Sequence, residues 1–419
     1  MKLYMNKVKF RKTELSNGLK VIVHEDKSTP MALINILYDV GAKDEDPSHT
    51  GFAHLFEHLM FGGSINIPDY EAPLQIVGGE NNAFTSNDLT NYYMQIPAVN
   101  LETGFWLESD RMLSLAFSEK SLEVQKNVVC EEFKQRYLNQ PYGDVWLKLR
   151  PVIYEKHPYK WPTIGKELRH IEEANMGQVK AFFKKHYSPK NAILVVAGGV
   201  NFKEVFALAE KYFGSIDGGK RYNRELPTEP AQKALRRLEI EGDVPADMLF
   251  MAFKMPDRMH PDYHSCDLIS DVLGNGESSR LRNKFLKENP LFSELSAYIM
   301  GSDETGLLVI SGRLLNTVSF ETAEDAIRAE LDLLIKDGVG NDELEKVKNK
   351  VESSFIFGNM DLFNKAFQLA YYELKGDANL VNEEIPKYRD VSTNDIKKMS
   401  KIILDSSQCT ILRYSRKDK

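Results

Sequence analysis

Polar and apolar positions near the start of the chain follow the two-residue period of β-strands. The stretches 8–15 and 19–24 flank Ser16-Asn17-Gly18, and Asn-Gly between alternating runs predicts a hairpin. A third strand is predicted over 31–40. Apolar residues then recur at helical spacing, and a continuous apolar run closes the region. The predicted helices and the final strand cover 101–115, 121–137, 175–186 and 192–197.

The second half of the chain repeats elements of the first half at a nearly constant offset. The stretch 268–273 before Gly-Asn-Gly matches 55–60 before Phe-Gly-Gly, and the last helix and strand of each half also match. A coincidental match of common helix–strand units remains an alternative explanation. If the repeat is real, the chain has an α+β fold with two homologous domains. Each domain would hold a mainly antiparallel sheet with helices packed on one face.

A polar stretch rich in glycine and proline separates the two predicted domains. It covers residues 216–232 and includes few apolar side chains, which is typical of a linker. We therefore expect an N-terminal domain over 1–215 and a C-terminal domain over 233–419.

Composition excludes several classes of protein. Hydrophobic residues make up 42% of the 419 residues and charged residues 27%, as in soluble globular proteins. The net charge of −7 gives no electrostatic case for binding nucleic acid. Three widely spaced cysteines, Cys130, Cys266 and Cys409, favour reduced thiols over a disulfide framework. With no apolar run of about 18 residues and no signal peptide, we expect a cytoplasmic protein without a membrane span. A trimmed periplasmic form is the alternative.

The sequence His54-Leu55-Phe56-Glu57-His58 is the strongest chemical signal in the chain. Histidines four residues apart lie on one face of a helix, and Glu57 stands beside them. Two imidazoles and a carboxylate are the parts of a hydrolytic zinc site. A chance match is the alternative, but the surrounding apolar residues place the motif on a buried helix, where unpaired polar groups are costly.

A catalytic zinc ion needs a third protein ligand. Glu131 and Glu132 lie on the predicted helix beside Val128, Val129 and Phe133. These two carboxylates can supply the ligand, although a carboxylate pair on a helix is more often simply solvated. From composition alone the choice stays open.

At this point the chain resembles the pitrilysin, insulin-degrading-enzyme and mitochondrial-processing-peptidase family of zinc metallopeptidases, in its short two-domain branch. The resemblance covers nearly the whole chain. It rests on His-x-x-Glu-His within 51–64 and on the segments 82–86, 90–93, 127–132, 188–192 and 274–281.

The resemblance implies roles for the motif residues in peptide-bond hydrolysis. His54, His58 and Glu132 would bind one Zn²⁺ per chain, with Glu131 as the fallback ligand and Mn²⁺ or Co²⁺ as alternative metals. Glu57 would be the general base. At an offset of 213 the motif positions fall on Asp267, Ser270 and Asp271, so we expect no second metal site.

The resemblance also implies a substrate-binding strand formed by Asn82, Ala83, Phe84 and Thr85. An extended, unfolded peptide would add to this strand through main-chain hydrogen bonds. The alternative is an ordinary strand with a threonine-rich solvent face.

Two positions depart from the family pattern. Gln125 stands seven residues before Glu132, where the family usually has a glutamate. The arginine of an arginine–tyrosine pair in the C-terminal domain is replaced by Leu291, while Tyr298 remains and Lys287 is the nearest upstream base. Tyr298 is thus a candidate catalytic residue without its partner.

The family resemblance, taken with the missing arginine and the short chain, implies a dimer. We expect either a homodimer or a heterodimer with a homologous subunit that carries the arginine–tyrosine pair, this chain being the zinc-bearing subunit. The alternative function is a non-catalytic scaffold, or a peptide-binding subunit, of the same fold.

Overall fold

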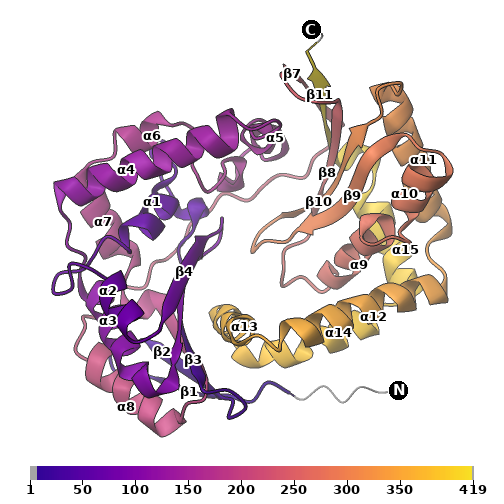
Figure 1. The fold of residues 1–419 in the computed structure, drawn as a ribbon. Coiled ribbons are helices and arrows are strands. Elements are labelled where there is room, and N and C mark those ends of the chain that lie inside the picture. Colours follow the sequence, from indigo (N-terminus) through magenta and orange to yellow (C-terminus); the bar gives the residue numbers. More distant parts are fainter. Residues whose placement is uncertain (1–6, 418–419) are drawn as a thin grey trace. The chain divides into compact units, whose positions relative to one another are not determined.

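A computed structural model describes residues 7–417 of the chain, and they form two compact units (Figure 1). Unit 1 comprises the chain up to Lys134 together with Trp161–Leu226 and Phe355–Glu384. Unit 2 comprises Gln135–Lys160, Pro227–Ser354 and the chain from Ile385 onward. Each unit thus includes a segment from the opposite half of the sequence.

Unit 1 is built on a six-stranded sheet in the order β1-β2-β6-β3-β5-β4. The β2–β6 pair is parallel and all other pairs are antiparallel. The strands are β1 Arg11–Glu14, β2 Lys20–Glu25, β3 Met31–Tyr38, β4 Glu80–Thr85, β5 Thr90–Pro97 and β6 Ala192–Gly198. The predicted hairpin is confirmed, although its first strand begins at Arg11 rather than at residue 8. Strand β4 pairs only with β5 within the sheet and forms its edge.

Helices cover both faces of this sheet. On β3, Leu33 lies in an apolar cluster with Leu369 of α13 (Leu362–Leu374). Its neighbour Ile34 points to the opposite face, where it lies against Gly104 of α3 (Leu101–Leu113). This alternation follows from the two-residue period of a strand. The remaining helices of unit 1 are α1 Phe52–Leu59, α2 Glu71–Ile76, α4 Glu119–Phe133, α6 Arg169–Glu172, α7 Met176–His186 and α8 Phe202–Phe213.

Unit 2 contains a five-stranded sheet in the order β7-β11-β8-β10-β9. This order reproduces β2-β6-β3-β5-β4 strand by strand, and the first pair, β7–β11, is again parallel. The sheet topology therefore supports the internal repeat. The strands are β7 Arg236–Gly242, β8 Met248–Met255, β9 Phe292–Met300, β10 Gly306–Leu314 and β11 Cys409–Arg416.

Helix α5 (Val145–Ile153) covers one face of the unit 2 sheet, although it belongs to the first half of the sequence. Its buried Leu149 packs with Phe250 and Val309. The other helices assigned wholly or mainly to this unit are α9 Tyr263–Gly274, α10 Arg280–Arg282, α11 Phe320–Asp337, α12 Asn341–Gly358, α14 Glu384–Asp390 and α15 Thr393–Ile403.

The α+β class and the mainly antiparallel sheets are confirmed, and the structure adds one feature to that prediction. Helices cover both faces of the unit 1 sheet. Helix α3, from the first half of the chain, packs on one face, and α13, from the second half, packs on the other. The compact units are therefore discontinuous in sequence and differ from the contiguous ranges 1–215 and 233–419. That these two ranges are homologous domains stays a prediction. Residues 217–235 form neither helix nor strand, and the linker over 216–232 stays a prediction.

The long helices form where apolar spacing predicts them. Helix α4 ends at Phe133, before the predicted end at 137, and a π-helical turn follows over Lys134–Leu138. The cysteines Cys130, Cys266 and Cys409 are buried free thiols. Across residues 7–417, none of the helices has the length and apolar character needed to cross a membrane.

Candidate metal centre

Helix α1 presents both histidines of the motif on one side. The rings of His54 and His58 lie 4.8 Å apart, nearly perpendicular to each other. Phe52, Leu55 and Phe56 of the same helix are buried, so the apolar face fixes the direction in which the histidines point. The four-residue spacing thus produces the common histidine face that the sequence predicts.

A buried carboxylate holds the start of α1. Glu45 accepts hydrogen bonds from the backbone N–H groups of Gly51 and Ala53, each at 2.9 Å. Gly51 has φ of 91°, a conformation that glycine adopts without strain. Burial raises the pKa of Glu45 to about 8, although its two backbone hydrogen bonds oppose the rise. Glu45 therefore satisfies donors at the helix N-terminus and fixes the entry into α1.

Glu132 of α4 completes a three-residue cluster with the two histidines. Its Oε2 atom lies 3.4 Å from Nε2 of His58 and 3.7 Å from Nε2 of His54. Within residues 7–417, these three side chains are the one group of His, Cys, Asp or Glu donors that could hold a metal ion, with all donor atoms within 4.8 Å.

The chemistry and spacing of these donors fit a zinc ion. Tetrahedral zinc with Zn–N and Zn–O bonds of about 2.0–2.1 Å separates its ligand atoms by about 3.3 Å. The separations of 3.4 and 3.7 Å are close to this value. Two imidazoles and one carboxylate also match a known donor set of hydrolytic zinc sites.

Glu131, the alternative third ligand, lies away from the cluster. Its side chain is 62% exposed and forms an ion pair with Lys134 at 2.7 Å, whereas Glu132 is 18% exposed. Successive helical residues differ by about 100° around the axis, so one of them faces the histidines and the other faces solvent.

Glu57 lies on α1 between the two histidines and is fixed by the edge strand. Thr85 donates a hydrogen bond from Oγ1 to Glu57 Oε2 at 2.6 Å. Burial raises the pKa of Glu57, the Thr85 hydrogen bond and His58 lower it, and Glu132 raises it. The carboxylate is thus held in one orientation, with its affinity for a proton increased.

The four predicted strand residues lie on the edge strand β4 of the sheet. The ring of Phe84 packs against Phe367 of α13 at 5.3 Å, while Thr85 points the other way, toward α1. Asn82 accepts a hydrogen bond through Oδ1 from the backbone N–H of Ala83 at 2.8 Å. Substrate binding along this edge strand stays a prediction.

Tyr298 and Lys287 lie in unit 2. Tyr298 is on β9 opposite Val309, packs against the apolar cluster that contains Leu149, and has its pKa raised by burial. Lys287 forms an ion pair with Glu277 at 3.4 Å and donates a hydrogen bond to the carbonyl of the same residue. Their catalytic roles stay predictions.

The repeat positions of the motif carry different interactions. On α9, Asp267 accepts a hydrogen bond from Tyr388, Ser270 donates to the carbonyl of Asp267, and Asp271 pairs with Lys350 at 3.7 Å. They form no group of metal donors like that on α1 within residues 7–417.

Sequence reasoning missed two contacts that build the site. It named Thr85 as a strand residue but not as the donor to Glu57, and it did not single out Glu45. Glu45 lies six positions before Gly51 and is not one of the residue types preferred at helix caps, so no capping pattern in the sequence marks it.

Comparisons with known proteins agree with this geometry. Residues 20–163 match the model described as Insulinase (Peptidase family M16), and residues 173–351 match the Peptidase M16 inactive domain. The zinc protease PqqE of Helicobacter pylori is 29% identical over 411 residues, covering 96% of this chain and 92% of that protein. The uncharacterized zinc protease YmxG of Bacillus subtilis is 26% identical over 346 residues, covering 81% and 82%.

Solved structures share the fold. The crystal structure of a protease from Helicobacter pylori superposes with a TM-score of 0.90 at 27% identity and covers 97% of this chain and 99% of that one. Pitrilysin superposes with a TM-score of 0.79 at 18% identity, and the match covers 99% of this chain but 46% of pitrilysin. The two family models and the Helicobacter pylori relatives, which match over more than 90% of both chains, lead to one conclusion: the chain belongs to the pitrilysin-like M16 peptidase family, in its short two-domain form.

Proposed function

We propose that this protein is a zinc-dependent endopeptidase that hydrolyses peptide bonds in unfolded peptides. The observation that carries the proposal is the convergence of His54, His58 and Glu132 beside the oriented carboxylate of Glu57. Relatives that are named zinc proteases support zinc as the metal. In this proposal the three side chains hold one zinc ion per chain.

Zinc at this position would supply a Lewis acid that polarises the substrate carbonyl and lowers the pKa of water. Glu57 accepts a proton from the attacking water at its carboxylate and returns it to the leaving amine. The raised pKa of Glu57 suits this exchange, because a general base works best with a pKa near the operating pH. Thr85 keeps the carboxylate pointed in one direction.

The substrate lies along β4 as an additional antiparallel or parallel strand. Asn82 to Thr85 offer main-chain groups at a sheet edge, and such groups bind extended backbone with little regard to side chains. Because Thr85 also bonds Glu57, a peptide paired with this segment lies next to the proposed base. This arrangement favours broad specificity and a requirement for unfolded chain.

The decisive experiment separates the base from the metal ligands. The Glu57→Gln variant should retain one zinc per chain by elemental analysis and lose peptidase activity by about 10²–10⁴-fold, the usual contribution of a general base. Glu131→Gln, an exposed change on α4, is the matched control and should keep both zinc and activity. Full activity of zinc-loaded Glu57→Gln would overturn the assignment.

A second candidate function is a non-catalytic scaffold or a peptide-binding subunit. It is favoured by the inactive-domain model that matches residues 173–351. A scaffold needs no metal, and a peptide-binding subunit holds metal only as a structural element. Removing metal with a chelator should abolish activity of the proposed enzyme without unfolding it, whereas a protein of either other kind has no peptidase activity to lose.

We further propose that the protein works as a dimer that encloses its substrate. The pitrilysin match leaves about half of that chain uncovered, as does the match to the Escherichia coli periplasmic protease PqqL, covered over 47% of its length. Longer chains of this fold thus have room for two such modules. Tyr298 would contact substrate, and an arginine would come from a homologous subunit. Native mass measurement with activity assays of the isolated chain tests this: full activity as a homodimer removes the need for a different partner.

A further inference from the structure

A large cavity lies on the surface of unit 1, at the C-terminal ends of α3 and α7. It has a volume of about 770 Å³, within the range of about 300–1,000 Å³ that is typical of ligand sites. Residues of the segment 216–223, which follows α8, complete the lining. The rings of Phe183 and Tyr187 line the cavity and also lie against Phe56 of α1. The metal donors are not among the lining residues, so this cavity is distinct from the metal centre.

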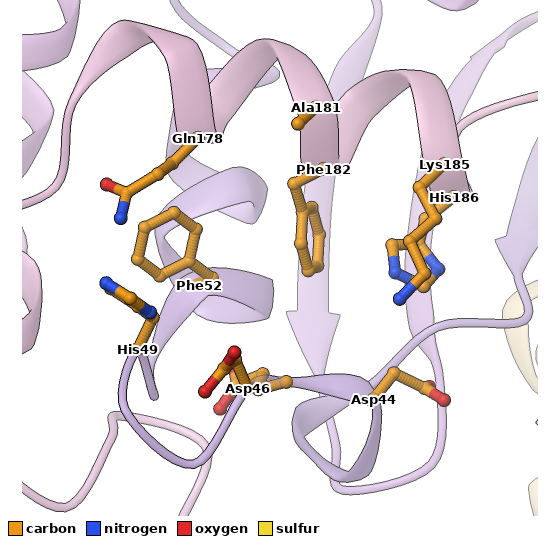
Figure 2. A pocket seen from close by; sticks show the side chains of 10 residues that line it. Asp44, Asp46, His49, Phe52, Gln178, Ala181, Phe182, Lys185 and His186 are labelled. Carbon is orange, nitrogen blue, oxygen red and sulfur yellow. The ribbon is translucent and has the colours of Figure 1, made fainter. Parts of the chain in front are cut away.

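Basic side chains outnumber acidic ones around the cavity. The basic residues of the lining are Lys184, Lys185, Lys220 and Arg221, and Figure 2 shows Lys185 extending from the end of α7. All four are exposed, and among residues 7–417 no ion pair involves any of them. The one acidic residue of the lining, Asp217, accepts a hydrogen bond from the backbone N–H of Gly219 at 3.0 Å. The chain as a whole is acidic, with a net charge of −7, so this concentration of positive charge is a local feature.

The two helix ends account for only part of this positive charge. Lysines in the last turn of a helix offset the partial negative charge of its C-terminus, which is about half an elementary charge. Lys184 and Lys185 lie in the last turn of α7, so this explanation fits them. Two helix ends together offset about one of the three excess positive charges. Lys220 and Arg221 lie in coil well beyond the end of α8, and their charge is available to a ligand.

The floor of the cavity is apolar and disfavours a compact anion. Met112, Pro189 and Ile216 are buried residues of the lining, and Leu113 is 52% exposed beside them. A phosphate group binds best at a helix N-terminus, where backbone N–H groups point at it. Here α3 and α7 present their C-terminal ends instead. The arrangement therefore fits a ligand that places apolar groups on the floor and negative charges at the basic rim.

Tyr222 holds part of this rim in place. Nζ of Lys185 lies 4.4 Å from the centre of the Tyr222 ring, a cation–π contact. The same ring lies edge-on against the buried ring of His186 at 4.7 Å. The segment 216–223 is thus attached to the end of α7 before any ligand binds. A surface that is already ordered loses less conformational entropy on binding.

We propose that this surface docks an acidic segment of a partner protein, an extended peptide in which carboxylate side chains alternate with apolar ones. The apolar side chains cover Met112 and Leu113, while the carboxylates pair with the lysines and Arg221 at the rim. Each exposed ion pair is weak by itself, so recognition requires several of them together. Such binding weakens as salt screens the charges.

The test uses the full chain with the Glu57→Gln substitution, so that the proposed peptidase activity does not consume the probe. The probe is the peptide Glu-Leu-Glu-Gly-Glu-Leu-Glu with both ends blocked. In isothermal titration calorimetry at low salt, its affinity should be at least about tenfold higher than that of the same peptide with glutamine at every glutamate. Serine in place of both leucines should also weaken binding, because contacts with the apolar floor are lost. Equal affinities of the glutamate and glutamine peptides, or of the leucine and serine peptides, would overturn the proposal.

Charge reversal tests whether the peptide binds at this cavity. Lys220→Glu combined with Arg221→Glu changes two exposed coil residues that form no ion pair among residues 7–417, so the variant should fold. It should lower the affinity for the glutamate peptide to that for the glutamine peptide. Lys27→Glu combined with Lys203→Glu is the matched control, because it changes the net charge equally at exposed positions outside the cavity. Undiminished binding by the first variant, or an equal loss in the control, would reject the site.

Two other anionic occupants are outcomes that would reject a peptide partner. Pyrophosphate, a compact anion, should bind more weakly than the glutamate peptide. Vesicles of phosphatidylserine and phosphatidylcholine in equal parts should not sediment the protein. Tighter binding of pyrophosphate would assign the cavity to a phosphate ligand. Sedimentation with the vesicles that the Lys220→Glu, Arg221→Glu variant loses would assign it to a membrane surface.

Discussion

Thr85 Oγ1 lies 2.6 Å from Glu57 Oε2, and this contact joins the edge strand β4 to the helix that carries both histidines. The predicted substrate-binding strand and the predicted base are therefore one connected structure. A change in β4 moves the hydrogen-bond donor of Glu57, and a peptide bound along β4, as proposed, would lie close to the carboxylate.

The Thr85→Val variant should lower activity while leaving zinc binding intact. A hydrogen bond to a charged group contributes about 1.5–3 kcal/mol, so its loss should reduce kcat roughly tenfold or more. Because this hydrogen bond lowers the pKa of Glu57, its loss raises that pKa. The acidic limb of the pH–kcat profile should then move to higher pH, since the base must be ionised to accept a proton.

Thr85→Ser keeps the hydroxyl and is the matched control, with kcat and the acidic limb expected near those of the unaltered protein. A Thr85→Val variant with unchanged kcat and an unchanged limb would mean that the hydroxyl does not orient Glu57.

The zinc content of two variants should show which of the adjacent glutamates of α4, Glu131 or Glu132, binds the metal. Glu132→Gln replaces a negatively charged metal ligand, whose oxygen lies 3.4 Å from His58 Nε2, with a neutral amide. The two imidazoles that remain are one ligand fewer than a catalytic zinc site needs. We expect loss of stoichiometric zinc in that variant. Glu131→Gln, which removes an exposed ion pair with Lys134, should keep about one zinc per chain. Zinc retained by Glu132→Gln and lost by Glu131→Gln would reverse the assignment.

The sequence predicts the local part of this site because local periodicity determines it. His54, Glu57 and His58 share one helix, so their common face follows from helical geometry. The register of β4 next to α1 and the choice between Glu131 and Glu132 depend on packing between segments far apart in the chain. The family resemblance indicated Glu132, and the exposure of the two side chains agrees with that choice.

The exchange of helices between the two halves lies beyond the sequence pattern. The apolar faces of α5 and α13, with Leu149 and Leu369, indicate that each helix is buried against something. The 3.6-residue period of apolar positions shows that one face of a helix is buried, but it does not identify the sheet against which that face packs. Neither α5 nor α13 is among the predicted helices.

Proline in a model peptide should reveal whether substrate pairs with β4. Proline has no N–H group and cannot donate to a sheet ladder, so a proline at the positions that face β4 should strongly reduce kcat/KM. We expect alternate positions near the scissile bond to be sensitive, because successive N–H groups of a strand point to opposite sides. Measuring cleavage of a proline-scanned peptide series checks this, with alanine at each position as the control. Equal cleavage of the proline and alanine series would exclude main-chain pairing.

The buried ring of His186 should make the fold less stable in acid. Its pKa is lowered from 6.5 to about 3, so between these values the unfolded chain binds a proton that the folded chain does not. Stability is therefore complete above pH 6.5 and falls as the pH decreases toward 3, by about 2 kcal/mol at pH 5 from this residue. Urea denaturation at pH 7.5 and pH 5, on protein stripped of metal, should show a smaller acid loss in His186→Phe than in the unaltered protein. His260→Phe, which replaces an exposed histidine, should not reduce the loss. If His186→Phe and the unaltered protein lose equal stability between the two pH values, the ring is not held neutral by its burial.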